Sequence, residues 1–241
     1  MEPLNVSKED FPMSTACAVG MIPMQPKIDN YELSYYEDVV YIKRGCRNLH
    51  LQILRPINAK EDLPCIVYIP GSAFHEQNVK ERVPQLSYLA QRGFVVAALE
   101  YRGSECAIFP AHALDADLYG PTNFATMNEE PSSQDHRTPD SPEGCEIGNK
   151  SILDHPELVK PTVIANYVQK DRELPPILMF HGTNDELVPF GQSCELFDAL
   201  QNAQKKATFY QVIGAHHGGR EFWTKEVLDI EEQFIRSLVT V

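Results

Sequence analysis

Residues 175–189 read PPILMFHGTNDELVP and decide the fold class of the chain. The four apolar residues Ile177–Phe180 end at His181-Gly182, a pattern typical of a buried strand that stops at a turn. Asp185 is therefore expected just beyond the carboxyl end of this strand. An acidic side chain at that position calls for a search of the neighbouring strand ends for groups that could act with it.

A second strand-and-turn pattern follows at residues 208–219. Residues 208–213 are strand-like, and the turn GAHHGG after them carries His216 and His217. An acid and a histidine on loops after two neighbouring parallel strands are how a hydrolytic triad places its second and third members. Asp185 is therefore a candidate acid, and the two histidines are candidates for its base. The alternatives are an ordinary Asn-Asp turn and a pair of exposed turn histidines.

Working outward, strands and helices alternate on both sides of the middle of the chain. Fully apolar strands separated by helices indicate parallel pairing through right-handed crossovers. The sequence thus predicts an α/β fold, a mostly parallel sheet flanked by helices. The expected elements are strands at 65–69, 94–99, 177–180 and 208–213, and helices at 83–90, 190–203 and 223–238.

The segments before the first of these strands have patterns of their own. Residues 39–42 and 49–54 alternate apolar and polar side chains around a short turn, which predicts an antiparallel hairpin at the edge of the sheet. Residues 1–36 show no sustained period and are expected to form an irregular arm. Residues 37–241 are then expected to form one domain, which suits a chain of this length.

Residues 121–170 do not follow the alternating pattern. A long, proline-containing, weakly patterned insertion in a compact domain is usually a functional lid or a mobile loop. We interpret it as a cap, or lid, over the site, with short helices at residues 152–158 and 161–168. Three histidines are expected on the surface or in the lid: His75, His136 and His155.

Composition limits the classes of partner and cofactor. The net charge is −13, which argues against nucleic acid or an anionic membrane as a partner. No apolar run is long enough to span a membrane, and the N-terminus lacks a basic signal-peptide lead, so a cytoplasmic protein is expected.

The six cysteines include no Cys-x-x-Cys pair, so reduced thiols and no zinc site are expected. His112, Asp115 and Asp117 are close in sequence but have no recognised ligand spacing; no metal or other cofactor is therefore expected. A homo-oligomer is left open.

Four motifs carry a resemblance to a known superfamily. They are IVYIPGSAFH at 66–75, VVAALEYRGS at 95–104, HGTNDELVP at 181–189 and GAHHGG at 214–219. Together they resemble the α/β-hydrolase superfamily, particularly its bacterial esterase, feruloyl-esterase-like and prolyl-oligopeptidase-like branches. The resemblance covers roughly residues 39–239. It implies a Ser-His-Asp hydrolase of small carboxylic esters, with Asp185 as the acid.

The resemblance also assigns a base and an oxyanion loop. The family follows its histidine with glycine, which favours His217 over His216 as the base. Gly71, Ser72 and Ala73 correspond to the loop whose backbone N–H groups bind the developing negative charge. A tight turn with no catalytic purpose is the alternative for this loop. Ser72 as a replacement nucleophile is a further alternative, although it would lie on the oxyanion side of the site.

The family's nucleophile is not found. Between FPA at 109–111 and LYG at 118–120 the family places a helix, the central strand, the Gly-x-Ser-x-Gly elbow and its helix, whereas here only residues 110–119 connect the two motifs. The whole chain contains no Gly-x-Ser-x-Gly. A deletion of the central strand-elbow-helix unit is therefore predicted, and it removes both the serine and half of the oxyanion hole.

Three functional hypotheses follow. The first is a serine carboxylesterase that uses Asp185 and His217 with a serine not yet identified. The second is a nucleophile-less relative, either a binding or scaffold protein or an internally deleted product without activity. The third is direct activation of water by the acid and the base, without a covalent step. On chemistry alone the second is preferred, because the base has no evident nucleophile to activate.

Overall fold

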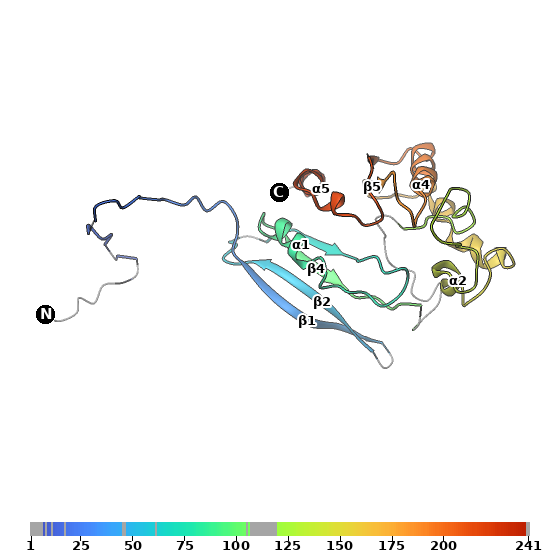
Figure 1. Ribbon diagram of the computed structural model, residues 1–241, viewed down its shortest axis with the longest axis horizontal. Coiled ribbons are helices and arrows are strands. Elements are labelled where there is room, and N and C mark those ends of the chain that lie inside the picture. The colour runs from blue at the N-terminus through green and yellow to red at the C-terminus, as the bar shows by residue number, and fades with distance from the viewer. Residues whose placement is uncertain are drawn as a thin grey trace.

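The computed structural model describes residues 7, 9–10, 12–16, 18–44, 47–60, 62–104, 106 and 120–239. Within these residues the chain forms two β-sheets with helices packed on them, and a long N-terminal arm leads away from this body (Figure 1). The predicted α/β organisation is therefore present. The link at residues 110–119, with His112, Asp115 and Asp117, lies outside the described residues.

The first sheet has four strands in the order β1-β2-β4-β3. Strands β1 (Leu33–Arg44) and β2 (Arg47–Pro56) pair antiparallel, as predicted for the hairpin. Strand β4 (Val95–Leu99) pairs antiparallel with β2 and parallel with β3 (Cys65–Tyr68). The helix between β3 and β4, α1 (Val83–Ala90), makes the predicted crossover and buries Leu86, Leu89 and Ala90 against the sheet.

The second sheet contains the opening stretch of the sequence. Strands β5 (Ile177–Gly182) and β6 (Ala207–Val212) pair in parallel, with helix α4 (Gly191–Asn202) between them. The last four residues of β5 are buried, which agrees with its apolar sequence. This strand-helix-strand unit places the carboxyl ends of β5 and β6, and the turns after them, at the same edge of the sheet.

The sheet arrangement differs from the expected mostly parallel sheet. In the described residues, β3–β4 and β5–β6 are the parallel pairs, and the two pairings of β2 are antiparallel. The result is a mixed four-stranded sheet and a separate two-stranded one. The physical reason lies in the edge hairpin: β2 joins the sheet antiparallel to β4, so both of its neighbours run against it.

Strand β3 also departs from its sequence pattern. An apolar run was expected to be buried on both faces, but Cys65 is exposed and Val67 is 58% exposed. Ile66 and Tyr68, on the other face, pack against the core under α1. The core under α1 thus covers the face of β3 that carries Ile66 and Tyr68, whereas Cys65 and Val67 lie on the face that is exposed.

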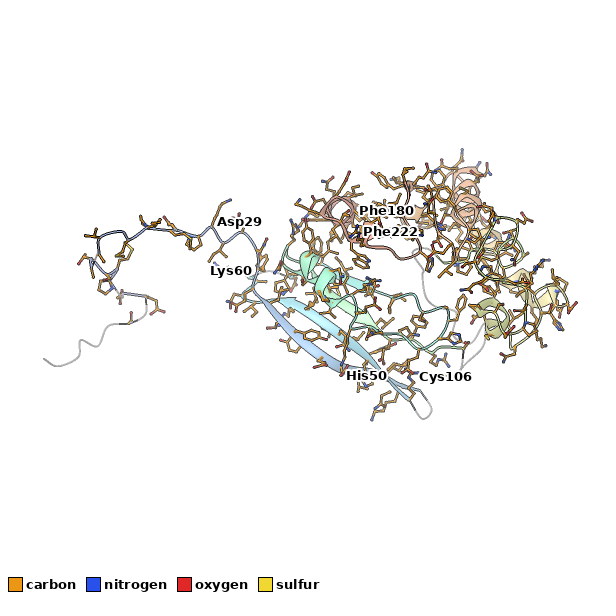
Figure 2. All side chains as sticks on the ribbon, viewed as in Figure 1. Asp29, His50, Lys60, Cys106, Phe180 and Phe222 are labelled. Atoms are coloured by element: carbon orange, nitrogen blue, oxygen red, sulfur yellow. The ribbon has the colours of Figure 1, made fainter. Side chains whose placement is uncertain are left out.

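A single tryptophan links the cores of the two sheets. Trp223 packs against the α1 core and also against a second cluster formed by Phe180, Ala215, Phe222 and Val227. Its ring lies edge-on to Tyr68 of β3, with centroids 6.0 Å apart. Figure 2 shows Phe180 and Phe222 close together beside the last helix, α5 (Lys225–Leu238). Helix α5 contacts α1 as well, so it spans both parts of the body.

Residues 121–170 form a compact unit with its own small core. Its short helices are α2 (Pro142–Glu146), α3 (Pro156–Val159), η1 (Lys160–Thr162) and η2 (Ile164–Tyr167). The short helices predicted near residues 152–158 and 161–168 are thus present with shifted bounds. Buried apolar side chains hold the unit together: Phe124, Ile147, Ile152 and Val159.

The N-terminal arm is extended and makes few contacts. Its base is attached where the Tyr31 N–H donates to the Gln91 carbonyl at 2.9 Å. Strand β1 begins at Leu33, three residues before the predicted end of the arm at residue 36. Figures 1 and 2 show the chain before Asp29 running away from the body. Its large apolar side chains are exposed: Met13, Val19, Met21, Ile22, Met24 and Ile28.

The buried carboxyl group of Glu231 in helix α5 makes the stability of the protein depend on pH. Burial raises the pKa of the Glu231 carboxyl to about 7. Because the unfolded chain releases this proton near pH 4.3, the stability is expected to fall as the pH rises from about 4.3 to 7. Glu231→Gln should therefore raise the free energy of unfolding at pH 8 by about 1–3 kcal/mol, and change it little at pH 4. Urea unfolding at the two pH values measures this, and equal effects at both would contradict it.

Candidate active site

The turns that follow β5 and β6 are joined to each other by main-chain hydrogen bonds. The Thr183 N–H donates to the Val212 carbonyl at 3.1 Å, and the Asn184 N–H donates to the Ala215 carbonyl at 3.0 Å. The Gly214 N–H donates to Thr183 Oγ1 at 2.8 Å. We call residues 183–188 the acid turn and residues 213–219 the histidine turn. Their side-by-side position follows from the parallel pairing of the strands before them.

The close approach of the two turns requires glycine at position 182. A Cβ atom on Gly182 would lie 2.2 Å from the carbonyl oxygen and 2.7 Å from the carbonyl carbon of Ala215. Both are far inside van der Waals contact, and both atoms belong to the backbone of the histidine turn. Glycine therefore sets the distance between the two turns.

Asp185 and His217, the two residues assigned as candidate acid and base, are in direct contact. Asp185 Oδ2 and His217 Nδ1 are 2.8 Å apart. The other carboxylate oxygen, Oδ1, accepts hydrogen bonds from the backbone N–H groups of Leu187 at 3.0 Å and Val188 at 2.9 Å. The carboxylate is fully buried, whereas the His217 side chain is 31% exposed. A fixed acid thus faces the inner nitrogen of a partly exposed imidazole, the arrangement that orients a histidine base.

Hydrogen bonding keeps Asp185 ionised. Burial by itself raises the pKa of this carboxyl, but the hydrogen bonds from His181 and His217 and from the Val188 backbone more than offset it. The net effect holds the pKa of Asp185 well below its usual range. At neutral pH the acid is therefore a carboxylate, which favours a proton on His217 Nδ1 and leaves Nε2 as the basic nitrogen.

A second histidine, not identified as functional in the sequence, completes the support of Asp185. His181 is fully buried at the end of β5, with Nε2 3.0 Å from the Val188 carbonyl and 3.1 Å from Asp185 Oδ2. A carbonyl only accepts, so Nε2 carries the proton, and Nδ1 accepts from the Ser193 hydroxyl at 2.7 Å. A histidine in an apolar strand, four residues before the acid, was the available sequence signal.

His216 points to a different partner. Its Nδ1 lies 3.0 Å from Glu186 Oε2, and its side chain is 63% exposed. The same Glu186 oxygen accepts from the backbone N–H of His217 at 3.4 Å. The structure thus separates the two histidines: His217 contacts the buried acid and His216 contacts an exposed one.

The candidate oxyanion loop follows β3, in the other sheet. Ala73 and Phe74 adopt left-handed backbone conformations, with φ of 49° and 65°, an uncommon and strained state for residues with a Cβ atom. Gly71 does not need to be glycine, because a Cβ atom there would meet nothing within 4 Å. The loop is held by Ser72 Oγ, which donates to the His75 carbonyl at 2.5 Å and lies 2.9 Å from the Tyr101 hydroxyl.

Three other sequence predictions concern Ser72, a metal site and His136. The Ser72 hydroxyl is engaged with the His75 carbonyl and the Tyr101 hydroxyl, which does not favour it as a replacement nucleophile. Among the residues that the structure describes, no group of three His, Cys, Asp or Glu side chains could hold a metal ion. His136, within residues 121–170, is buried and not on the surface.

Gly182 provides a steric test of the site. Gly182→Ala should destabilise the protein by about 1–3 kcal/mol, because the added methyl group has to displace the backbone of Ala215. Gly71→Ala is the matched control, with an expected change within about 0.5 kcal/mol. Denaturant unfolding of the two variants measures the difference, and equal stability of both would show that the turns do not approach so closely.

The charge on Asp185 provides a second test. Its lowered pKa stabilises the fold above the unfolded value of about 3.9, and this contribution is lost as the pH falls below that value. Asp185→Asn should therefore cost about 1.5–3 kcal/mol at pH 7, the range for a buried hydrogen bond to a charged group. The cost should shrink at pH 3. A cost that is the same at both pH values would contradict an ionised Asp185.

Comparison with known proteins identifies the fold and the family. A search of curated protein sequences gave no significant match. Among solved structures, the chain is similar to a truncated carbohydrate esterase from gut microbiota, with a TM-score of 0.72 and 24% identity over 88% of this chain and 98% of that one. It is also similar to esterase B from Lactobacillus Rhamnosis, with a TM-score of 0.63 and 12% identity over 89% and 87%. At these identities the matches show an α/β-hydrolase-like fold.

A thermophilic esterase from the planctomycete Thermogutta terrifontis gives a TM-score of 0.58 and 19% identity over 88% of this chain and 96% of that one. No helix among the described residues is long and apolar enough to cross a membrane.

The BD-FAE family model, which describes carbohydrate and feruloyl esterases of the α/β-hydrolase fold, matches residues 51–117 and 113–200. Together the two matches cover more than half of the sequence, so the chain belongs to the BD-FAE family of esterases.

Proposed function

We propose that this chain is a BD-FAE relative that keeps the acid and the base of an esterase site without an acyl-accepting serine. It then binds small carboxylic esters and does not form an acyl-enzyme. The observation that carries this proposal is the sequence itself, in which 241 residues contain no Gly-x-Ser-x-Gly. A base and its orienting acid cannot supply the covalent step without a nucleophile.

The form of the family match supports a missing central unit. The family model matches in two pieces, and these overlap at residues 113–117, inside the short link between the two motifs. A single uninterrupted match would be expected if the chain between the oxyanion motif and the lid were of ordinary length. In the proposed interpretation, the two pieces are the two ends of a family domain brought together.

The arrangement of strands is consistent with the same interpretation. The described residues form a four-stranded sheet that ends at β3 and a separate two-stranded sheet, β5 with β6. A deleted central strand would leave a sheet divided in this way, and loss of the helices flanking that strand would leave a face of β3 uncovered, where Val67 is exposed. The elbow would also have carried one of the two oxyanion donors, so the loop at residues 71–73 would be left with an incomplete hole.

A second candidate function is hydrolysis by activated water. The partly exposed His217 ring and the ionised Asp185 favour it, because together they make a base that solvent can reach. The base would take a proton from water as the water oxygen attacks the ester carbonyl, and the proton would then pass to the departing alcohol. This route needs no serine, but it lacks the gain in rate that a covalent intermediate provides.

The proposal is tested by turnover and by covalent labelling. Purified protein is expected to hydrolyse p-nitrophenyl acetate no faster than His217→Ala, and a fluorophosphonate probe is expected to label no serine. Intact-protein mass spectrometry measures the labelling. Labelling of one serine, with turnover lost in His217→Ala, would contradict the proposal and establish a serine esterase.

Turnover without labelling would favour the activated-water alternative. In that case Asp185→Asn should lower kcat by about 10²–10⁴-fold, the usual contribution of a general base. Saturable binding of a non-hydrolysable ester analogue, measured by calorimetry, would support the ester-binding function itself.

A further inference from the structure

The lid contacts the acid turn through two adjacent serines. The Ser133 N–H donates to the Glu186 carbonyl at 2.7 Å, and the Ser133 hydroxyl donates to the same oxygen at 2.9 Å. Ser132 Oγ lies 3.2 Å from the Glu186 carbonyl oxygen and 3.1 Å from that of Leu187. The lid is thus hydrogen-bonded to the backbone that immediately follows Asp185.

Behind Ser132 lies a buried histidine and a buried acid. Ser132 Oγ is 2.8 Å from His136 Nε2, and His136 Nδ1 is 2.9 Å from Glu143 Oε2. The side chains of His136 and Glu143 are each only 3% exposed. Glu143 belongs to α2, whose N-cap Ser141 donates to the His136 carbonyl at 3.1 Å. This chain of contacts fixes Ser132 to the interior of the lid.

The order serine, histidine, acid is that of a hydrolytic triad, but the surroundings of Ser132 do not suit a nucleophile. Its oxygen has two main-chain carbonyl oxygens at 3.1 and 3.2 Å, which would repel a developing negative charge. The Gln134 N–H donates to Ser132 Oγ itself at 3.2 Å. This donor therefore binds the serine oxygen before any reaction and is not directed at a substrate carbonyl. A nucleophile needs donors directed at the reacting carbonyl oxygen instead. The contacts therefore favour a positioning role over a catalytic one.

Glu186 extends the connection from the lid to the histidine turn. Its carbonyl accepts from the N–H and the hydroxyl of Ser133 and lies 3.2 Å from Ser132 Oγ. Its carboxylate contacts His216 Nδ1 at 3.0 Å and accepts from the His217 N–H at 3.4 Å. One residue thus connects the lid, the acid turn and the backbone of the candidate base. Movement of the lid at Ser132 would be transmitted directly to both members of the Asp185–His217 pair.

We propose that three residues of the lid act through Glu186 to hold the His217 ring in hydrogen-bond contact with Asp185. We call these residues, Ser132, His136 and Glu143, the lid latch. The latch rests on the proposed acid–base pair and adds to it a positioning device supplied by the lid. Closing the lid over a ligand and aligning the base are then one event, because the same hydrogen bonds serve both. None of the latch residues touches the reacting atoms, so they are positioning residues.

The test uses the His217 Nδ1 proton, which gives a low-field NMR resonance when it is held against a carboxylate. Its assignment follows from its loss in His217→Gln. In Ser132→Ala the resonance should move upfield or broaden away, because the latch loses the hydroxyl between His136 and the acid turn. Ser132→Thr should restore it, because threonine keeps the hydroxyl. Tyr167→Phe, which removes an exposed lid hydrogen bond to the Pro161 carbonyl, should leave it unchanged.

Amide exchange of Leu187 and Val188, whose N–H groups donate to Asp185, gives an independent measurement. Faster exchange in Ser132→Ala and Glu143→Gln than in Tyr167→Phe, with all variants folded by circular dichroism, supports the latch. An unchanged resonance and unchanged exchange in both latch variants overturn it. Phosphonate labelling of Ser132 also overturns it, since it would make Ser132 a nucleophile. A missing resonance in the unmodified protein would refute the acid–base pair, whereas the exchange data would still decide the latch.

Discussion

The buried carboxylate of Asp185 is the group on which the site depends. It accepts hydrogen bonds from His217, from His181 and from two backbone N–H groups of its own turn. A charge in such a place is tolerated only while these donors are present, because an unpaired buried carboxylate costs several kcal/mol. The strand, the turn and the histidine are therefore held together by one requirement.

The same requirement reaches into other parts of the fold. Ser193 of α4 hydrogen-bonds to His181 in β5, so the crossover helix supports the acid through His181. Residues 121–170 contact the acid turn as well, through Ser132, Ser133 and the carbonyl of Glu186. Gly182 lets the histidine turn approach closely enough to join this network. Elements that are far apart in the sequence thus meet at a single carboxylate.

Membership of an esterase family and a well-formed acid–base pair do not by themselves make an esterase. In the proposed interpretation the chain has kept the part of the site that is built from its C-terminal strands and its lid. The part that would carry the serine belongs to the middle of the sheet, and the sequence has only a short link there. The acid–base pair survives such a loss because its supports all come from β5, β6, α4 and the lid. In that interpretation, this independence explains how the acid–base pair can persist without a nucleophile.

The sequence by itself determined the alternation of strands and helices, the edge hairpin, and the positions of Asp185 and His217, because these depend on local periodicity and on turns next to strands. It could not predict the division into two sheets or the exposure of Val67, since the covering of a strand depends on its neighbours. It also could not show that His181 and Glu186 flank the pair, or that His136 is buried with Glu143. Only the tertiary structure decided these, because such contacts join residues whose spacing in the sequence carries no recognisable pattern.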